Sequence, residues 1–305
     1  MTSFFHDPSI WVIFNVIVAI LLAFDLGIFH RKSQELSYAQ ALTMSFIWIA
    51  LALLFSLWLT MAHGKEMGIL FLTGYAIEKS LSLDNIMVIA IIFETLKIPL
   101  SYQYRVLFWG IIGALSLRFI MIWGGVVLIQ KFHFLIFLFG LLMIITGLKI
   151  IFLKKNQENL SHSNTWKMIQ RILPITDQYK GKNFFTKQGE KVYATPLLVA
   201  LIWIEFSDIV FAVDSIPAIF SITQEPFLIY TSNVFAILGL RSLYFVLPKV
   251  ITNLRFLKKG LGLVVIFIGL KMIGIIKVEV LTFLLIVLTT LGASSLASWK
   301  TRYKI

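Results

Sequence analysis

Long apolar segments recur along the whole chain and constrain its fold more than any other feature. Each contains about 20 residues, enough for a helix to cross roughly 30 Å of hydrocarbon. Lipid offers the backbone no hydrogen-bond partners, so segments of this kind must be helical. We therefore expect an all-α, polytopic helical membrane protein, with residues 1–305 forming a single transmembrane domain. The nine expected transmembrane helices are residues 10–29, 40–62, 67–95, 104–130, 133–153, 195–222, 227–248, 260–276 and 279–299.

The composition agrees with this class of protein. Hydrophobic residues make up 59% of the chain and charged residues 14%, whereas a soluble domain is roughly 25% charged. The chain has no cysteine, which excludes a disulfide framework and a thiolate metal site. A net charge of +12 is compatible with nucleic-acid binding. The placement of the basic residues instead indicates a membrane surface, and no nucleic-acid partner is expected.

The basic residues are concentrated in alternate connecting segments. If the N-terminus lies outside, the cytoplasmic segments contain 19 of the 27 Lys and Arg residues. The positive-inside rule then favours an outside (periplasmic) N-terminus and a cytoplasmic C-terminus. The longest such segment, residues 154–194, is predicted to be a cytoplasmic loop. It has apolar residues at helical spacing from Trp166 to Leu173, which suggests a short interfacial helix, and a hairpin around Gln188 and Gly189.

The stretch FSDIVFAVDSIPAIF, residues 206–220, would be an ordinary apolar helix without its two aspartates, and Glu205 directly precedes it. An ionised carboxylate at the bilayer centre costs about 3 kcal/mol on insertion scales, so such residues normally face a bundle interior or a water-filled path. Pro217 leaves the carbonyl of Val213 without its helical donor. We therefore expect the helix to open locally beside Asp214 and to offer carbonyl and carboxylate oxygens together.

The sequence contains an internal duplication. EKSLSLDN, residues 78–85, and DIVFAVDS, residues 208–215, share an acid, five residues, an aspartate and a small polar side chain. In each set the next span carries an arginine, Arg118 or Arg241, and the span after that carries the motif GLK. Each unit has three spans, so the second copy enters the membrane in the opposite orientation, as in the inverted repeats of many secondary transporters. The predicted repeats are residues 67–153 and 195–276.

The acids of the two aligned motifs, together with Glu205, are matched in number by five basic residues within the spans. The acids are Glu78, Asp84, Glu205, Asp208 and Asp214. The charge-balancing cations are Lys79, Arg118, Lys149, Arg241 and Lys271. Six residues turn an ideal helix by about 240°, so the two aligned acids of each repeat cannot share one narrow face. Two interpretations stay open: ion pairs that fasten one helix to another, or a cation site.

Carboxylate, amide and hydroxyl oxygens without thiolates favour a hard divalent cation such as Mg2+, Ca2+ or Mn2+. The predicted metal ligands are Glu78, Asp84, Asn85, Glu205, Asp208, Asp214 and Ser215. Residue type does not decide among the three metals, because the size, rigidity and ligand number of the site set its selectivity.

Three segments of the chain carry a family resemblance: LTGYAIEKSLSLDN at 72–85, EFSDIVFAVDSIPAIFSIT at 205–223 and TSNVFAILGLRSLYF at 231–245. They closely resemble the signature segments of the TerC family of integral membrane proteins, including its Alx branch. The resemblance implies a multi-pass protein of the bacterial inner (plasma) membrane, associated with manganese export and with tellurite resistance. It also implies that the five acids named above are the family's intramembrane acids. Mn2+ would be the transported substrate, and no tightly bound cofactor is expected.

The leading hypothesis is an exporter that carries Mn2+ out of the cytoplasm by alternating access. Proton antiport is a natural drive, because protons and metal compete for the same carboxylates. The expected partners are thus the metal ion, protons and the lipid bilayer. An intramembrane enzyme is not expected, since neither G-x-G-D nor H-E-x-x-H occurs. The alternative is a membrane assembly or stress-resistance factor without direct transport, and tellurite, an oxyanion that carboxylates repel, is interpreted as a phenotype.

Overall fold

The computed structural model describes residues 7–30, 38–152, 174–176, 181–188, 191–246 and 255–302. Most of these residues are helical. The elements in chain order are α1 (Pro8–His30), α2 (Tyr38–His63), α3 (Lys65–Thr95), α4 (Leu100–Lys131), α5 (Phe134–Phe152), β1 (Phe185–Gln188), β2 (Lys191–Ala194), α7 (Pro196–Phe220), α8 (Pro226–Leu238), α9 (Leu240–Val246), α11 (Arg255–Met272) and α12 (Val280–Arg302).

Every predicted span coincides with a helix, and the span predicted at 227–248 is divided into α8 and α9 at Gly239. Within the described residues, six helical segments are long and apolar enough to cross a membrane: α2, α4, α5, α7, the α8–α9 segment and α12. The prediction of nine such spans is therefore confirmed for six. α3 and α11 carry more charged residues, and the described apolar part of α1 is shorter. The chain is an all-α polytopic membrane protein, and the described residues contain one small hairpin besides the helices.

Proline and glycine set several helix ends. Pro196 and Pro226 lie in the first turns of α7 and α8, where the missing N–H has no helical acceptor to lose. Gly64, between α2 and α3, has φ 100°, a conformation that favours glycine. Pro217 lies inside α7, which continues without a break to its last turn. The predicted local opening is therefore wrong, because a proline this close to the end removes one hydrogen bond without interrupting the helix.

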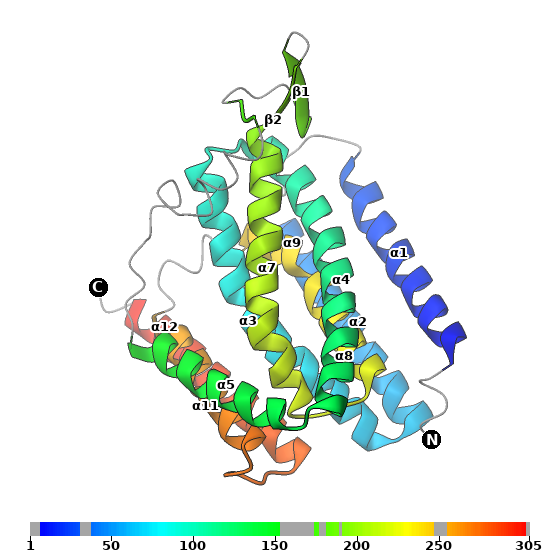
Figure 1. Ribbon diagram of the computed structural model, residues 1–305, viewed down its shortest axis with the longest axis vertical. Coiled ribbons are helices and arrows are strands. Elements are labelled where there is room, and N and C mark those ends of the chain that lie inside the picture. The colour runs from blue at the N-terminus through cyan, green and yellow to red at the C-terminus, as the bar shows by residue number, and fades with distance from the viewer. Residues whose placement is uncertain are drawn as a thin grey trace.

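The predicted hairpin is confirmed by the antiparallel pairing of β1 with β2, in which Gln188 is opposite Lys191. Thr195 fastens the hairpin to the start of α7, since its Oγ1 donates to the carbonyl of Asn183 at 2.7 Å. The hairpin lies at one end of the bundle and the start of α1 at the other (Figure 1). The interfacial helix expected at 166–173 lies outside the described residues.

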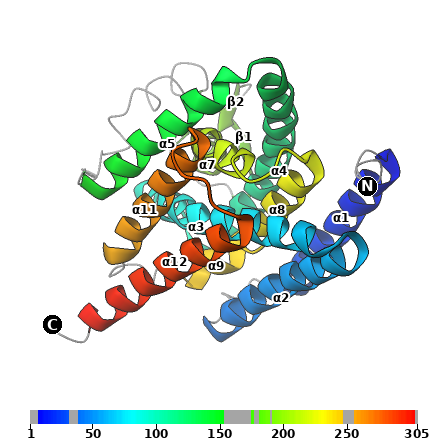
Figure 2. The same ribbon diagram turned by 90° about the horizontal axis from the view of Figure 1, so that it is seen from below.

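The centre of the bundle is formed by α3, α4, α7 and α8. α3 packs against α2, α7, α8 and α12, and α4 packs against α7 and α8. α3 and α7 run in opposite directions (Figure 1). Seen from below, α1 and α2 lie on one side of this centre and α5, α11 and α12 on the other (Figure 2). The acid-bearing helices are thus enclosed by other helices.

α5 and α11 pack backbone against backbone through four glycines. A Cβ atom on Gly147 would lie 2.6 Å from the carbonyl oxygen of Gly262, and one on Gly269 would lie 2.6 Å from that of Gly140. When the two GLK motifs are aligned, Gly140 matches Gly262 and Gly147 matches Gly269. Each contact therefore maps onto the other, and the interface is reciprocal.

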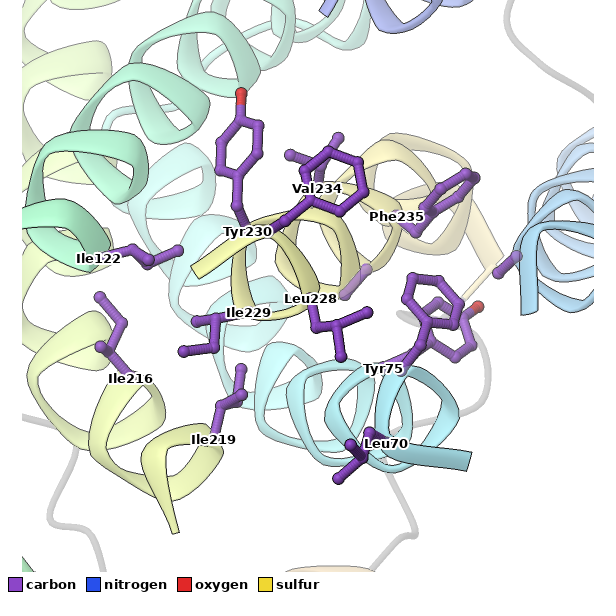
Figure 3. Packing of buried hydrophobic residues seen from close by; sticks show 14 of the residues in the cluster. Leu70, Tyr75, Ile122, Ile216, Ile219, Leu228, Ile229, Tyr230, Val234 and Phe235 are labelled. Carbon is purple, nitrogen blue, oxygen red and sulfur yellow. The ribbon is translucent and has the colours of Figure 1, made fainter. Parts of the chain in front are cut away.

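Buried apolar side chains form three clusters. The first joins α1, α2 and α8 to one end of α3, α4 and α7, and Figure 3 shows its side chains meeting between α3, α7 and α8. The second joins α9 to the other end of α3, α4 and α7. The third joins α5, α11 and α12 around Met143 and Phe283. Labelled members of the first cluster are Leu70, Tyr75, Ile122, Ile216, Ile219, Leu228, Ile229, Tyr230, Val234 and Phe235.

Candidate functional site

A polar layer separates the first and second apolar clusters near the middle of the central helices. On α3 the buried residues of the first cluster end at Tyr75 and those of the second begin at Ile86. On α7 the second cluster ends at Ile204 and the first begins at Ala212. The same division occurs on α4, on either side of Arg118. The layer is therefore enclosed by hydrocarbon side chains at both ends, as a site halfway across a membrane would be.

Arg118 of α4 joins the two acids that begin the aligned motifs, Glu78 of α3 and Asp208 of α7. Its Nε donates to Asp208 Oδ2 at 3.1 Å and its Nη2 to Asp208 Oδ1 at 2.9 Å. Its Nη1 forms an ion pair with Glu78 Oε1. Arg118 and Glu78 are each 1% exposed and Asp208 is 8% exposed. The planar guanidinium suits such bidentate pairing. Arg118 thereby connects α4 with α3 and α7.

Two amides contact this group of charges, one at Arg118 and one at Asp208. Asn233 of α8 accepts a hydrogen bond from Arg118 Nη1 through its Oδ1. Asn85 of α3 donates from Nδ2 to Asp208 Oδ1 over a long 3.4 Å. Glu78 and Asn85 are seven residues apart, as are Asp208 and Ser215, and a seven-residue spacing returns to nearly the same helix face. Glu78 and Asn85 therefore lie on nearly the same face of α3, the face that is directed at Arg118 and Asp208.

Several buried oxygens of the layer have no hydrogen-bond partner in the described part of the chain. They are both carboxylate oxygens of Glu205, Oδ1 of Asn85 and the hydroxyl oxygens of Ser82 and Ser215. A buried polar atom left unpaired costs about 1–3 kcal/mol, and in a native protein it needs an explanation such as an ion or ordered water. Glu205, Asn85 and Ser215 are among the predicted metal ligands, and their role in binding a cation stays a prediction.

A small cavity of about 40 Å³ adjoins Asp208 on the side of the second apolar cluster. Its polar lining comes from Asn85, Ser207, Asp208 and Arg241, and the remaining lining is apolar or glycine. A water molecule needs only about 10–15 Å³ measured in this way. The cavity can therefore hold water or a small ion beside the carboxylate.

Not every predicted ligand can be placed. Asp84 and Asp214 lie within α3 and α7, but their side chains are outside the part of the chain that the structure describes. Among the described side chains, no three His, Cys, Asp or Glu form a group that could hold a metal ion. The described geometry brings together Glu78, Asn85 and Asp208, with Arg118 between the two acids.

The other predicted charge-balancing cations have different surroundings. Lys79 donates from Nζ to the carbonyl of Ala236 in α8 at 3.0 Å. Lys271 lies over the Phe283 ring, 4.4 Å from its centroid, and Lys149 is exposed. Arg241 is buried and lines the cavity. Within the described residues, none of Lys79, Lys149 and Lys271 forms an ion pair with an acid. The side chains of Asp84 and Asp214 are not among these residues, so charge balancing by the three lysines stays a prediction.

Two polar residues of the layer, Asn233 and Ser82, are absent from the predicted ligand set. The signal for Asn233 is the polar triplet TSN, residues 231–233, in an otherwise apolar span, and all three of these residues are buried. The signal for Ser82 is its position four residues after Glu78, on the same helix face. Both residues could have been predicted from these signals, because a polar side chain inside a membrane helix normally faces other helices.

The fold and the site define a class of protein: a multi-pass membrane protein with a buried layer of charged and polar side chains across its central helices. The chain belongs to the integral membrane protein TerC family, whose profile matches residues 63–304. No solved structure matches the chain.

Relatives cover nearly the whole chain. An uncharacterized membrane protein of Myxococcus xanthus is 46% identical over 294 residues, covering 96% of this chain and 92% of the relative. One of Rickettsia bellii is 43% identical over 261 residues, covering 86% of each. A relative in Photorhabdus laumondii, named as a candidate membrane-bound redox modulator, Alx, is 41% identical over 276 residues, covering 88% of this chain and 86% of the relative. These names describe the relatives and assign no substrate.

Proposed function

We propose that this protein exports a divalent metal cation, with Mn2+ as the substrate, from the cytoplasm by alternating access through the polar layer. The observation that carries the proposal is the set of polar groups halfway along the central helices. Arg118 contacts the carboxylates of Glu78 and Asp208 there, and oxygens of Asn85, Glu205 and Ser215 have no partner in the described residues. Carboxylate, amide and hydroxyl oxygens are the ligands that hard divalent cations prefer.

The charges of the layer also favour a cation. Glu78, Asp208 and Glu205 carry three carboxylates, and in the described contacts only Arg118 pairs with any of them. Asp84 and Asp214 complete the proposed ligand set on sequence grounds. Proton antiport belongs to the proposal, because carboxylates that release a metal ion can take up protons. No catalytic step and no tightly bound cofactor are proposed.

An inverted repeat, residues 67–153 against 195–276, belongs to this proposal. Two observations support it. Arg118 binds Glu78 and Asp208, which occupy matching positions in the two motifs. When the two repeats are aligned, the contact between Gly147 and Gly262 corresponds to the contact between Gly269 and Gly140. Related halves that meet at a central site are the architecture on which alternating access rests in many transporters.

The proposed location is the bacterial inner membrane, with the N-terminus outside and the C-terminus in the cytoplasm. The excess of Lys and Arg in the corresponding loops supports this orientation. Export then means that the layer opens first toward the side of the β1–β2 hairpin, which lies within the basic segment 154–194, and afterwards toward the side on which α1 begins.

The alternative is an assembly or stress-resistance factor, for example in tellurite resistance, without direct transport. Such a factor would hold its intramembrane charges ready for partner proteins. Arg118, Glu78 and Asp208 instead pair within the chain, which favours the transporter. The redox role in the name of one relative would need a mechanism other than thiol–disulfide exchange by this chain, since its 305 residues contain no cysteine.

Metal flux into liposomes that contain the purified protein tests the proposal. Mn2+, Ca2+ and Mg2+ are offered separately, with and without an imposed pH gradient. We expect Mn2+ uptake that falls about tenfold or more in Asp208→Asn, because changes even at the partners of metal ligands have effects of this size. Glu66→Gln, an exposed acid in the first turn of α3, is the control. Absence of flux, or wild-type flux in Asp208→Asn, would contradict the proposal.

A further inference from the structure

The guanidinium of Arg118 occupies the position between Glu78 and Asp208 that a shared metal ion would need. Both carboxylate oxygens of Asp208 accept hydrogen bonds from Arg118, and Glu78 Oε1 is paired with its Nη1. A divalent cation that joined these two carboxylates would use the same oxygens. It would then lie in contact with a like charge, which repels it strongly at short range in a buried site.

We propose that Arg118 is an internal substitute for the transported cation: it neutralises Glu78 and Asp208 when the carrier is empty, and the metal ion displaces it on binding. This inference rests on the proposed transport function and adds a role for one residue. The structure then corresponds to the empty carrier. Arg118 suits the role because its guanidinium stays charged in proteins, so the substitute cation is always available.

The surroundings of Arg118 provide for such an exchange. Asn233 accepts a hydrogen bond from Nη1, so the guanidinium keeps one partner on α8 when it leaves the carboxylates. The cavity beside Asp208, lined also by Asn85, Ser207 and Arg241, lets a cation approach this carboxylate from the side of the second apolar cluster. The metal ion and the guanidinium can therefore replace one another while Asp208 always keeps a positively charged partner.

The exchange has a functional consequence for the return of the empty carrier. Two neighbouring carboxylates without a counter-ion would be costly to carry through a closed, dry intermediate. With Arg118 in place, the empty carrier keeps its acids paired while it changes orientation. Net transport needs this return step, whereas one-for-one exchange of metal across the membrane uses only loaded carriers.

Comparison of Arg118→Gln, Arg118→Lys and wild type tests the inference, with Lys271→Gln as the control that removes a positive charge without an acidic partner among the described residues. The measurements are Mn2+ affinity of the purified protein, net Mn2+ flux, and exchange of labelled for unlabelled Mn2+ across proteoliposomes. In Arg118→Gln we expect Mn2+ to bind about tenfold more tightly or better, equivalent to about 1.4 kcal/mol. Net flux should fall about tenfold while exchange stays within about threefold.

Arg118→Lys keeps the charge but loses the planar fork, so its Mn2+ affinity should lie between those of the other two proteins. This variant carries the test if Arg118→Gln does not fold. Weaker or unchanged Mn2+ binding in a folded variant, or equal losses of net flux and exchange, would overturn the inference. If wild type shows neither flux nor exchange, the proposed function itself fails, which is a separate outcome.

Discussion

The carboxylate of Glu205 lies directly against Gly113 of α4, so a methyl group at position 113 would occupy the place of the carboxylate oxygens. Glycine at this position therefore admits an unpaired acid to the interface between α4 and α7. α4 and α7 pack against each other, which places Glu205 of α7 beside this position.

Gly113→Ala should displace the Glu205 side chain while leaving the fold intact. The group it meets is the end of a flexible side chain, and alanine in a helix is favoured over glycine by about 1 kcal/mol. We expect an unfolding temperature equal to or above that of wild type, together with a reduced Mn2+ flux in proteoliposomes. Gly124→Ala is the matched control, because nothing lies within 4 Å of its new methyl group. Equal Mn2+ flux in the two variants would show that Glu205 is not part of the transport site.

Removal of one partner from the Arg118–Asp208 pair should destabilise the protein strongly. Asp208→Asn leaves a buried guanidinium with fewer partners, and loss of one member of a buried ion pair typically costs about 3–5 kcal/mol. The double variant Asp208→Asn with Arg118→Gln should lose less than the sum of the single variants, since the two residues share one interaction. Unfolding in detergent measures the effect, and exposed Lys149→Gln should stay within about 0.5 kcal/mol. Strict additivity would show that the pair contributes nothing to stability.

The α5–α11 interface should tolerate no side chain at its glycines. Gly147→Ala and Gly269→Ala each place a methyl group 2.6 Å from a backbone carbonyl, and backbone cannot rotate away as a side chain can. We expect each variant to lower the free energy of unfolding by about 1–3 kcal/mol, the usual range for overpacking. Gly292→Ala on α12 has open space around it and should have no such effect. Comparable stability of all three variants would show that the helices can separate freely.

A hydrogen bond between α9 and α4 should be needed for stability outside the polar layer. Tyr244 donates its hydroxyl to Gln103 Oε1 at 2.9 Å, and Gln103 Nε2 donates to the carbonyl of Ile98 at 2.9 Å. Both side chains are buried. Tyr244→Phe leaves the amide oxygen unpaired, so we expect a loss of about 1–3 kcal/mol in thermal or chemical unfolding. Exposed Tyr38→Phe is the control, and an equal result for both would show that water replaces the lost hydroxyl.

The helices could be predicted closely because their signals are local. Apolar length located the spans, proline and glycine located several ends, and a turn signal located the β1–β2 hairpin. The one local prediction that was wrong concerned Pro217, where the sequence shows a lost donor but not how well the neighbouring turns hold the helix together.

The acids show where prediction from sequence stops. Glu78 and Asp208 are unusual in the sequence alone, because a carboxylate within an apolar helix is costly wherever it faces. The sequence leaves two interpretations of them open, an ion pair between helices and a cation site. Asn233 was not recognised, although it contacts Arg118, because an uncharged amide raises the cost of a span much less.

The sequence by itself determined the class of protein, the helices and the positions of the charged residues along each helix. Each of these depends on the properties of neighbouring residues along one segment. Only the tertiary structure decided that Arg118, among the intramembrane cations, lies between Glu78 and Asp208, whereas Lys79 turns to a backbone carbonyl. The physical reason is that a pairing across helices depends on the rotation and spacing of each helix, and all packed neighbours set these together.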